Sequence, residues 1–130
     1  MTRILIVEDN PQNLKLARVI LEGAGYDAQG ATDAHEAEML LAQGTPDLIL
    51  MDLGLPGKDG YAFTRELRGR PDTAQVPILA VTSYAMKGDR AKAMEAGCSG
   101  YLTKPIDRHL LLFQIQAALG ARPPNGGGRP

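Results

Sequence analysis

The sequence predicts an α/β fold in which five parallel strands and five helices form one doubly wound sheet. Apolar runs of strand length and segments with helical spacing alternate five times along the chain. The run at 48–51 has four apolar residues between turn residues, which is typical of a strand buried on both faces of a parallel sheet. With 130 residues, 44% of them hydrophobic, the chain suffices for one core. We therefore expect one domain, over residues 1–120.

The composition excludes several classes of function. Fourteen basic and fifteen acidic residues leave a net charge of -1, so no electrostatic argument favours binding to nucleic acid or to an anionic membrane surface. Cys98 is the one cysteine, which rules out an internal disulfide and fits a reducing compartment. Residues 1–3 lead directly into a strand, without an apolar segment long enough for a signal peptide or a membrane span. We expect a cytoplasmic protein.

The first strand and helix are the clearest elements. Residues 4–7 form a β-branched apolar run. Asn10 is a favourable N-cap and Pro11 fits the first helical position, so a helix begins there and ends near Gly25. Residues 26–31 predict a weaker strand whose polar side chains suit the edge of a sheet.

Three further elements follow in the middle of the chain. Asp33 and Glu36 have the spacing of a capping box, which predicts a helix that Gly44 ends. The buried strand then covers 47–51. A third helix is predicted over 61–70, with Phe63 and Leu67 on one face and Pro71 beyond its end.

The sequence pattern is clear for the fourth strand and weak for the helix that follows it. Residues 76–81 predict a strand with a proline near its start, where a missing donor is tolerated. A helix over 85–96 would contain Gly88 in its interior, so we expect it to be marginal and mobile. Its apolar stripe is short: Met86, Ala91 and Met94.

The last strand, 100–103, precedes a helix that Asp107 caps and that runs to about Leu119. This helix carries two apolar stripes, Leu111, Ile115, Ala118 and Leu119 on one side and Leu110, Phe113 and Ala117 on another. Only one can face the sheet, and the other either binds a partner or packs on the fourth helix. Residues 121–130 have too little apolar content to order themselves, so we expect a disordered tail or linker.

Reactive side chains follow four of the predicted strands: Glu8, Asp9, Asp52, Thr82 and Lys104. Parallel strands end at one edge of the sheet, where α/β folds bind ligands. Two carboxylates about 5 Å apart repel by roughly 3 kcal/mol at an effective dielectric constant near 20, so the acids require a cation, and oxygen ligands suit Mg²⁺. One carboxylate could then attack phosphorus, while the lysine and the hydroxyl contact the phosphoryl oxygens.

Each of these residues also has an ordinary structural interpretation. Asp52 alone could cap a turn, and the Glu8 and Asp9 pair could be a solvated strand end. Lys104 alone is more often a surface lysine, and Thr82 could simply be a β-branched strand residue. The set favours the functional interpretation because four strand ends supply complementary groups. His35 and His109 lack acidic or cysteine partners at ligand spacing, and we expect both to be solvated.

From residue 3 to about 120, this order of residues resembles the CheY-like receiver domain of two-component response regulators. The resemblance rests on the acidic pair, on Asp52 in Met-Asp-Leu-Gly-Leu-Pro, on Thr82 before a small residue, and on Lys104-Pro105. It implies a flavodoxin-like sheet with strand order 2-1-3-4-5. It also implies that Asp52 accepts a phosphoryl group from a phosphohistidine on a sensor histidine kinase or histidine phosphotransferase.

The resemblance assigns further roles. Asp9, Asp52 and the backbone carbonyl of Gly54 would hold Mg²⁺, with Glu8 binding directly or through water. Thr82 and Tyr101 look like the family's switch pair, which repacks the surface of the fourth helix, fifth strand and fifth helix for a downstream protein. Such a chain catalyses its own phosphorylation and dephosphorylation and is a signalling switch. Residues 85–89 and 96–98 look similar to DivK-type stand-alone regulators and to receivers of hybrid kinases.

Other interpretations remain. A flavodoxin-like mononucleotide protein shares the strand order. In this chain, however, the acidic pair after the first strand would repel a phosphate unless a metal intervened. The chain could also be a constitutive interaction module, or a receiver cut from a larger hybrid kinase or regulator. Since Gly54 cannot shield the nucleophile, we expect Tyr84 to set the phosphate lifetime. Surface residues of the first helix, such as Asn13, Lys15 and Leu16, would select partners.

Overall fold

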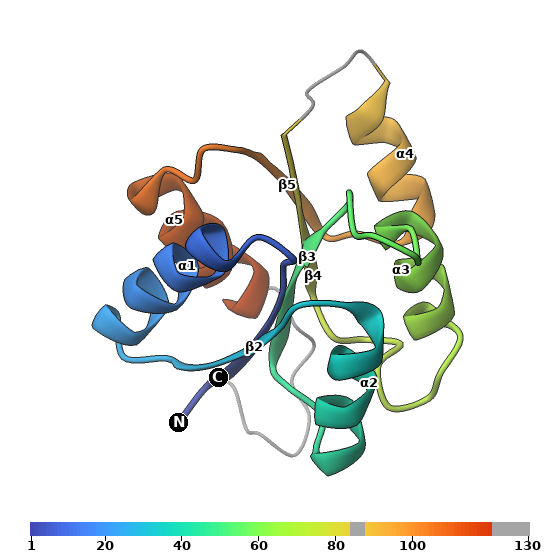
Figure 1. Ribbon diagram of the computed structural model, residues 1–130, viewed down its shortest axis with the longest axis horizontal. Coiled ribbons are helices and arrows are strands. Elements are labelled where there is room, and N and C mark those ends of the chain that lie inside the picture. The colour runs from blue at the N-terminus through green and yellow to red at the C-terminus, as the bar shows by residue number, and fades with distance from the viewer. Residues whose placement is uncertain (84–87, 121–130) are drawn as a thin grey trace.

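The computed structural model describes residues 1–83 and 88–120, and its centre is one five-stranded sheet in the order β2-β1-β3-β4-β5 (Figure 1). All neighbouring strands run parallel. The strands are β1 (Arg3–Val7), β2 (Asp27–Ala31), β3 (Leu48–Asp52), β4 (Ile78–Thr82) and β5 (Gly100–Thr103). The predicted fold class and strand order are confirmed.

Helices cover both faces of this sheet and bury two apolar layers (Figure 1). They are α1 (Pro11–Gly23), α2 (Ala34–Gln43), α3 (Gly60–Arg68), α4 (Asp89–Ala96) and α5 (Arg108–Gly120). One layer contains side chains of α1 and α5, and the other contains side chains of α2, α3 and α4. Such double coverage explains why the central strands are apolar on both faces.

The central strand β3 positions the carboxylate at its end. All five of its residues are buried. Leu48 and Leu50 belong to the layer under α1 and α5, while Ile49 and Met51 belong to the opposite layer. Because β3 lies between β1 and β4, Asp52 emerges in the middle of the sheet's carboxyl edge.

The predicted N-caps are formed at α1, α2 and α5. The Asn10 side chain accepts hydrogen bonds from the N–H groups of the next two non-proline residues. Asp33 and Asp107 cap α2 and α5 by accepting one hydrogen bond each, from the N–H group three residues further on. The capping box differs in one detail. Glu36 accepts from the N–H and hydroxyl of Thr32, one residue before the cap.

The prediction for the fourth helix was wrong at its start and on its buried face. Gly88 lies before α4 as its N-cap, with φ of 91°, a left-handed conformation that a helix interior excludes. Ala93 and Ala96 are the buried residues, whereas Met94 is 37% exposed. Residues 84–87, and with them Tyr84 and Met86, lie outside the described residues, as does the segment 121–130.

The two stripes of α5 have different surroundings. Leu111 and Ile115 are buried against the sheet, whereas Phe113 is 68% exposed and Leu110 is 46% exposed. The stripe with Leu111 therefore faces the core, and the other faces outward. Within residues 1–83 and 88–120, no helix has the length and apolar character needed to cross a membrane.

Candidate active site

The carboxyl edge of the sheet contains a cleft that brings together the reactive residues of four strand ends. Its lining consists of Glu8, Asp9, Asn10, Asn13, Asp52, Gly54, Thr82, Ser83 and Lys104. Among the predicted site residues that the structure describes, Tyr101 alone is outside this lining. It is half-buried on β5 and packs against the layer of α2, α3 and α4.

Three carboxylates form the acidic part of the cleft. Glu8 and Asp52 are 4% and 6% exposed, whereas Asp9 is exposed. One carboxylate oxygen of each residue lies within 4.8 Å of those of the other two. The Asp52 Oδ1 atom also accepts a hydrogen bond from the Gly54 N–H at 2.9 Å, which fixes the side chain at the end of β3.

Lys104 neutralises part of this charge. Its Nζ lies 2.7 Å from Oε1 of Glu8 and 3.4 Å from Oδ2 of Asp52. The other Glu8 oxygen accepts from the Asn10 N–H at 3.1 Å. Burial disfavours the charged amine, but the hydrogen bond to Glu8 and the charge of Asp52 outweigh it, so the pKa of Lys104 is raised. The amine therefore stays protonated at neutral pH.

The donor set fits Mg²⁺. All three ligand groups are carboxylates, which are the hard oxygen ligands that this ion prefers. Two of them are buried and fixed by hydrogen bonds, while the exposed Asp9 leaves one side open to the water ligands that Mg²⁺ usually keeps. Three acids against one lysine also leave negative charge for a cation to offset.

Thr82 completes the opposite side of the cleft. It ends β4 with 8% of its surface exposed, and its backbone carbonyl accepts from the Lys104 N–H at 2.8 Å. This bond holds the ends of β4 and β5 together, so the hydroxyl and the amine enter the same cleft. His35 and His109 are exposed on α2 and α5 and are not part of the lining.

Sequence reasoning assigned Asn13 to a partner-binding surface, but the structure places it in the cleft. It is half-buried in the first turn of α1. The available signal was the N-cap at Asn10, which places the first turn of α1 beside the acidic pair. The sequence alone does not show which side of that turn faces the strand ends.

Comparisons with known proteins agree with this geometry. A family model described as the response regulator receiver domain matches residues 4–116. The polar-differentiation response regulator DivK of Brucella anthropi is 38% identical over 117 residues, which are 90% of this chain and 95% of DivK. RpaA of Synechocystis sp., a DNA-binding dual master transcriptional regulator, is 40% identical over 119 residues, which are 92% of this chain but only 49% of RpaA.

A solved receiver provides the structural comparison. The receiver domain of the sensor histidine kinase PA1611 from Pseudomonas aeruginosa was crystallised with a magnesium ion coordinated in its active site cleft. It is 38% identical, with a TM-score of 0.84, over 92% of this chain and 98% of that one. The resemblance inferred from the reactive residues is thereby confirmed. This chain belongs to the family of response regulator receiver domains.

Proposed function

We propose that the chain is a phosphorylation-dependent signalling switch whose Asp52 accepts a phosphoryl group from a phosphohistidine on a sensor histidine kinase or histidine phosphotransferase. The main support is the position of Asp52, which lies among acids whose oxygens are within 4.8 Å of one another and has Lys104 Nζ at 3.4 Å from its carboxylate. An oxygen of Asp52 forms the new bond to phosphorus. The phosphorus–nitrogen bond breaks, and its electron pair remains with the imidazole.

The residues around Asp52 would divide the remaining work. Glu8, Asp9, Asp52 and the carbonyl of Gly54 would hold Mg²⁺, which supplies positive charge to the phosphoryl oxygens. The magnesium in the PA1611 receiver supports this choice of ion. Lys104 and the Thr82 hydroxyl would donate hydrogen bonds to the same group as its charge develops.

The output would be a change in the α4-β5-α5 surface. Thr82 ends β4, and Tyr101 lies on the adjacent strand, where it pairs in register with Ala80. Movement of the Thr82 hydroxyl toward the new phosphate would leave space that the Tyr101 ring can fill. A downstream protein would then bind the altered surface. The cytoplasmic location stays a prediction.

Mass spectrometry with acetyl phosphate tests this function. The wild type should gain one phosphoryl group only when Mg²⁺ is present, and Asp52→Asn should gain none. Asp72→Asn, which removes an exposed carboxylate outside the cleft, should behave as the wild type. An unmodified wild type that also fails to bind Mg²⁺ would instead favour a constitutive interaction module.

The extent of the natural protein is a separate question. The region that is similar to this chain makes up nearly all of DivK but only about half of RpaA. Among its relatives, a receiver of this kind therefore occurs both by itself and joined to a further region. A receiver from a larger hybrid kinase or regulator therefore remains the alternative to a stand-alone switch. The phosphorylation experiment gives the same result for either.

A further inference from the structure

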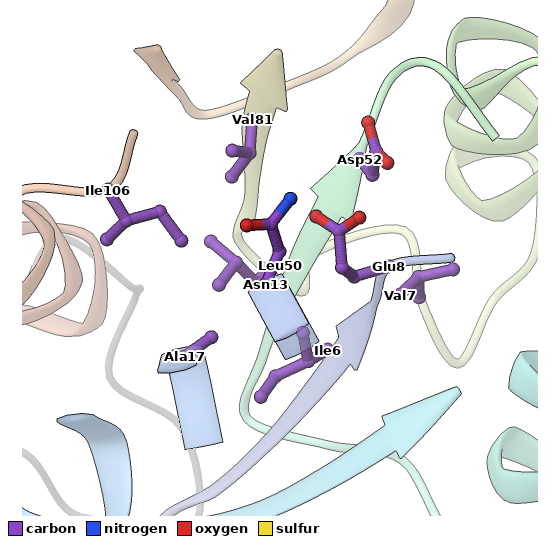
Figure 2. A pocket seen from close by; sticks show the side chains of 9 residues that line it. All are labelled: Ile6, Val7, Glu8, Asn13, Ala17, Leu50, Asp52, Val81 and Ile106. Carbon is purple, nitrogen blue, oxygen red and sulfur yellow. The ribbon is translucent and has the colours of Figure 1, made fainter. Parts of the chain in front are cut away.

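Asn13 lies where two spaces meet beside Asp52. It lines the open cleft and also a cavity of about 10 Å³ directly below it. The cavity is lined by Ile6, Val7, Glu8, Asn13, Ala17, Leu50, Asp52, Val81 and Ile106. Figure 2 shows that the Asn13 carboxamide, like the carboxylates of Glu8 and Asp52, points toward the carboxyl ends of the strands.

The hydrogen bonds around Asn13 leave its carboxamide available. Its backbone N–H donates to Oδ1 of Asn10 at 3.0 Å. In the part of the chain that the structure describes, its side chain has no hydrogen-bond partner, whereas Glu8 and Asp52 are held by Lys104 and by backbone N–H groups. Leaving a partly buried amide without a partner is unfavourable, so a ligand in the cleft would satisfy it.

We propose that Asn13 is a phosphoryl-binding residue, whose Nδ2–H donates a hydrogen bond to an oxygen of the phosphoryl group during its transfer to Asp52. This inference rests on the proposed function. Apart from Glu8, Asn13 and Asp52, the cavity below is lined by apolar side chains, so it gives the carboxamide no neutral polar partner on that side. The cleft above is where the phosphoryl group must lie to react with Asp52.

The chemistry favours a neutral donor at this place. When acetyl phosphate is the donor, the Asp52 oxygen bonds to phosphorus, and the phosphorus–oxygen bond to acetate breaks with its electron pair on acetate. Negative charge spreads over the three phosphoryl oxygens in the transition state. A carboxamide can donate to one of them without competing with Mg²⁺ for the carboxylates, as a second lysine would.

Asn13→Leu tests the hydrogen bond because leucine has a similar size but no donor. Phosphorylation by acetyl phosphate, followed by intact mass, should slow about tenfold, as expected for loss of one hydrogen bond to a charged group. Mg²⁺ affinity from calorimetry and the thermal midpoint should stay at wild-type values. Gln12→Leu is the matched control, since Gln12 is exposed in the same helical turn. Equal rates for Asn13→Leu and wild type, or equal slowing in both leucine variants, would overturn the proposal.

Asn13→Asp provides a second variant with opposite effects on two measurements. A fourth carboxylate should tighten Mg²⁺ binding and yet slow phosphorylation, because it repels the phosphoryl oxygens and cannot donate. A purely structural role would not separate these two quantities, and faster phosphorylation would contradict the proposal. If the wild type itself is not phosphorylated, the proposed function fails. If the wild type is phosphorylated and Asn13→Leu reacts at the same rate, the proposed function stands and only the role of Asn13 fails.

Discussion

Gly60 shows how one residue fixes the position of Asp52, the proposed nucleophile. It begins α3 directly against the end of β3, and its N–H donates to the Leu53 carbonyl at 3.3 Å. A Cβ atom here would lie 2.5 Å from the Asp52 carbonyl oxygen and 2.6 Å from Leu53 Cα. Both are backbone atoms, so no side-chain rotation relieves the overlap. Helix and strand can approach this closely only at glycine.

Gly60→Ala should therefore destabilise the protein by about 2 kcal/mol, which is typical of overpacking, and should slow phosphorylation because the strand end that carries Asp52 must move. Gly69→Ala is the control, since its Cβ would make an ordinary contact of 3.5 Å with the Glu66 carbonyl oxygen. Urea unfolding measures both. A Gly60→Ala stability equal to that of Gly69→Ala would show that the junction can adjust.

Arg68 connects elements that the sheet alone does not hold. It lies in the last turn of α3, and its guanidinium donates at 2.6 to 3.4 Å to acceptors in the loop before β4 and in the turn after α4. The acceptors are the carbonyls of Thr73, Ala74, Val76 and Gly97 and the hydroxyl of Ser99. The planar fork therefore joins α3 to the loop before β4 and to the turn between α4 and β5.

Replacing Arg68 by lysine keeps the charge but loses this geometry. An ammonium group cannot reach acceptors in so many directions, so some buried carbonyls lose their partner. We expect Arg68→Lys to lower the free energy of unfolding by about 1 to 3 kcal/mol. Arg65→Lys, at an exposed position of the same helix, should change it by less than about 0.5 kcal/mol. Similar urea midpoints for the two variants would contradict the role assigned to the fork.

The two faces of α5 provide a second test at the level of an element. Ile115 is fully buried, whereas Phe113 is 68% exposed on the outward stripe. Ile115→Ala should cost about 2 to 5 kcal/mol because it creates a cavity, and Phe113→Ala should cost less than about 0.5 kcal/mol in the monomer. Denaturant unfolding of the two variants at low protein concentration measures the difference. A large loss in Phe113→Ala would show that the outward stripe is covered.

At the scale of the whole molecule, the sequence was most informative about the sheet and its reactive edge. Short apolar runs between turn residues predicted the strands, and parallel strands place their ends together, so Glu8, Asp52 and Lys104 could be assigned to one site. The start of α4 depended on the left-handed conformation of Gly88, which composition does not reveal. The inward direction of Asn13 depended on how α1 packs against the sheet.

The charge of the site links its chemistry to the stability of the whole fold. Carboxylate oxygens within 4.8 Å of one another repel, and Lys104 is ion-paired with only two of the three acids, Glu8 and Asp52. Asp9 is exposed and forms no ion pair within residues 1–83 and 88–120. Mg²⁺ bound to the folded chain alone should raise the free energy of unfolding, by about 2.7 kcal/mol at a concentration one hundred times the dissociation constant.

Asp9→Asn should change this response in two opposite ways. Without Mg²⁺ the variant should be more stable than the wild type, because one repelling charge has gone, and with Mg²⁺ it should gain little, because a ligand has gone with it. Glu95→Gln removes an exposed acid on α4 and should keep the full response to Mg²⁺. Urea unfolding at constant ionic strength separates specific binding from screening. An undiminished gain from Mg²⁺ in Asp9→Asn would place the ion elsewhere on the molecule, because loss of a ligand must weaken the binding that stabilises the fold.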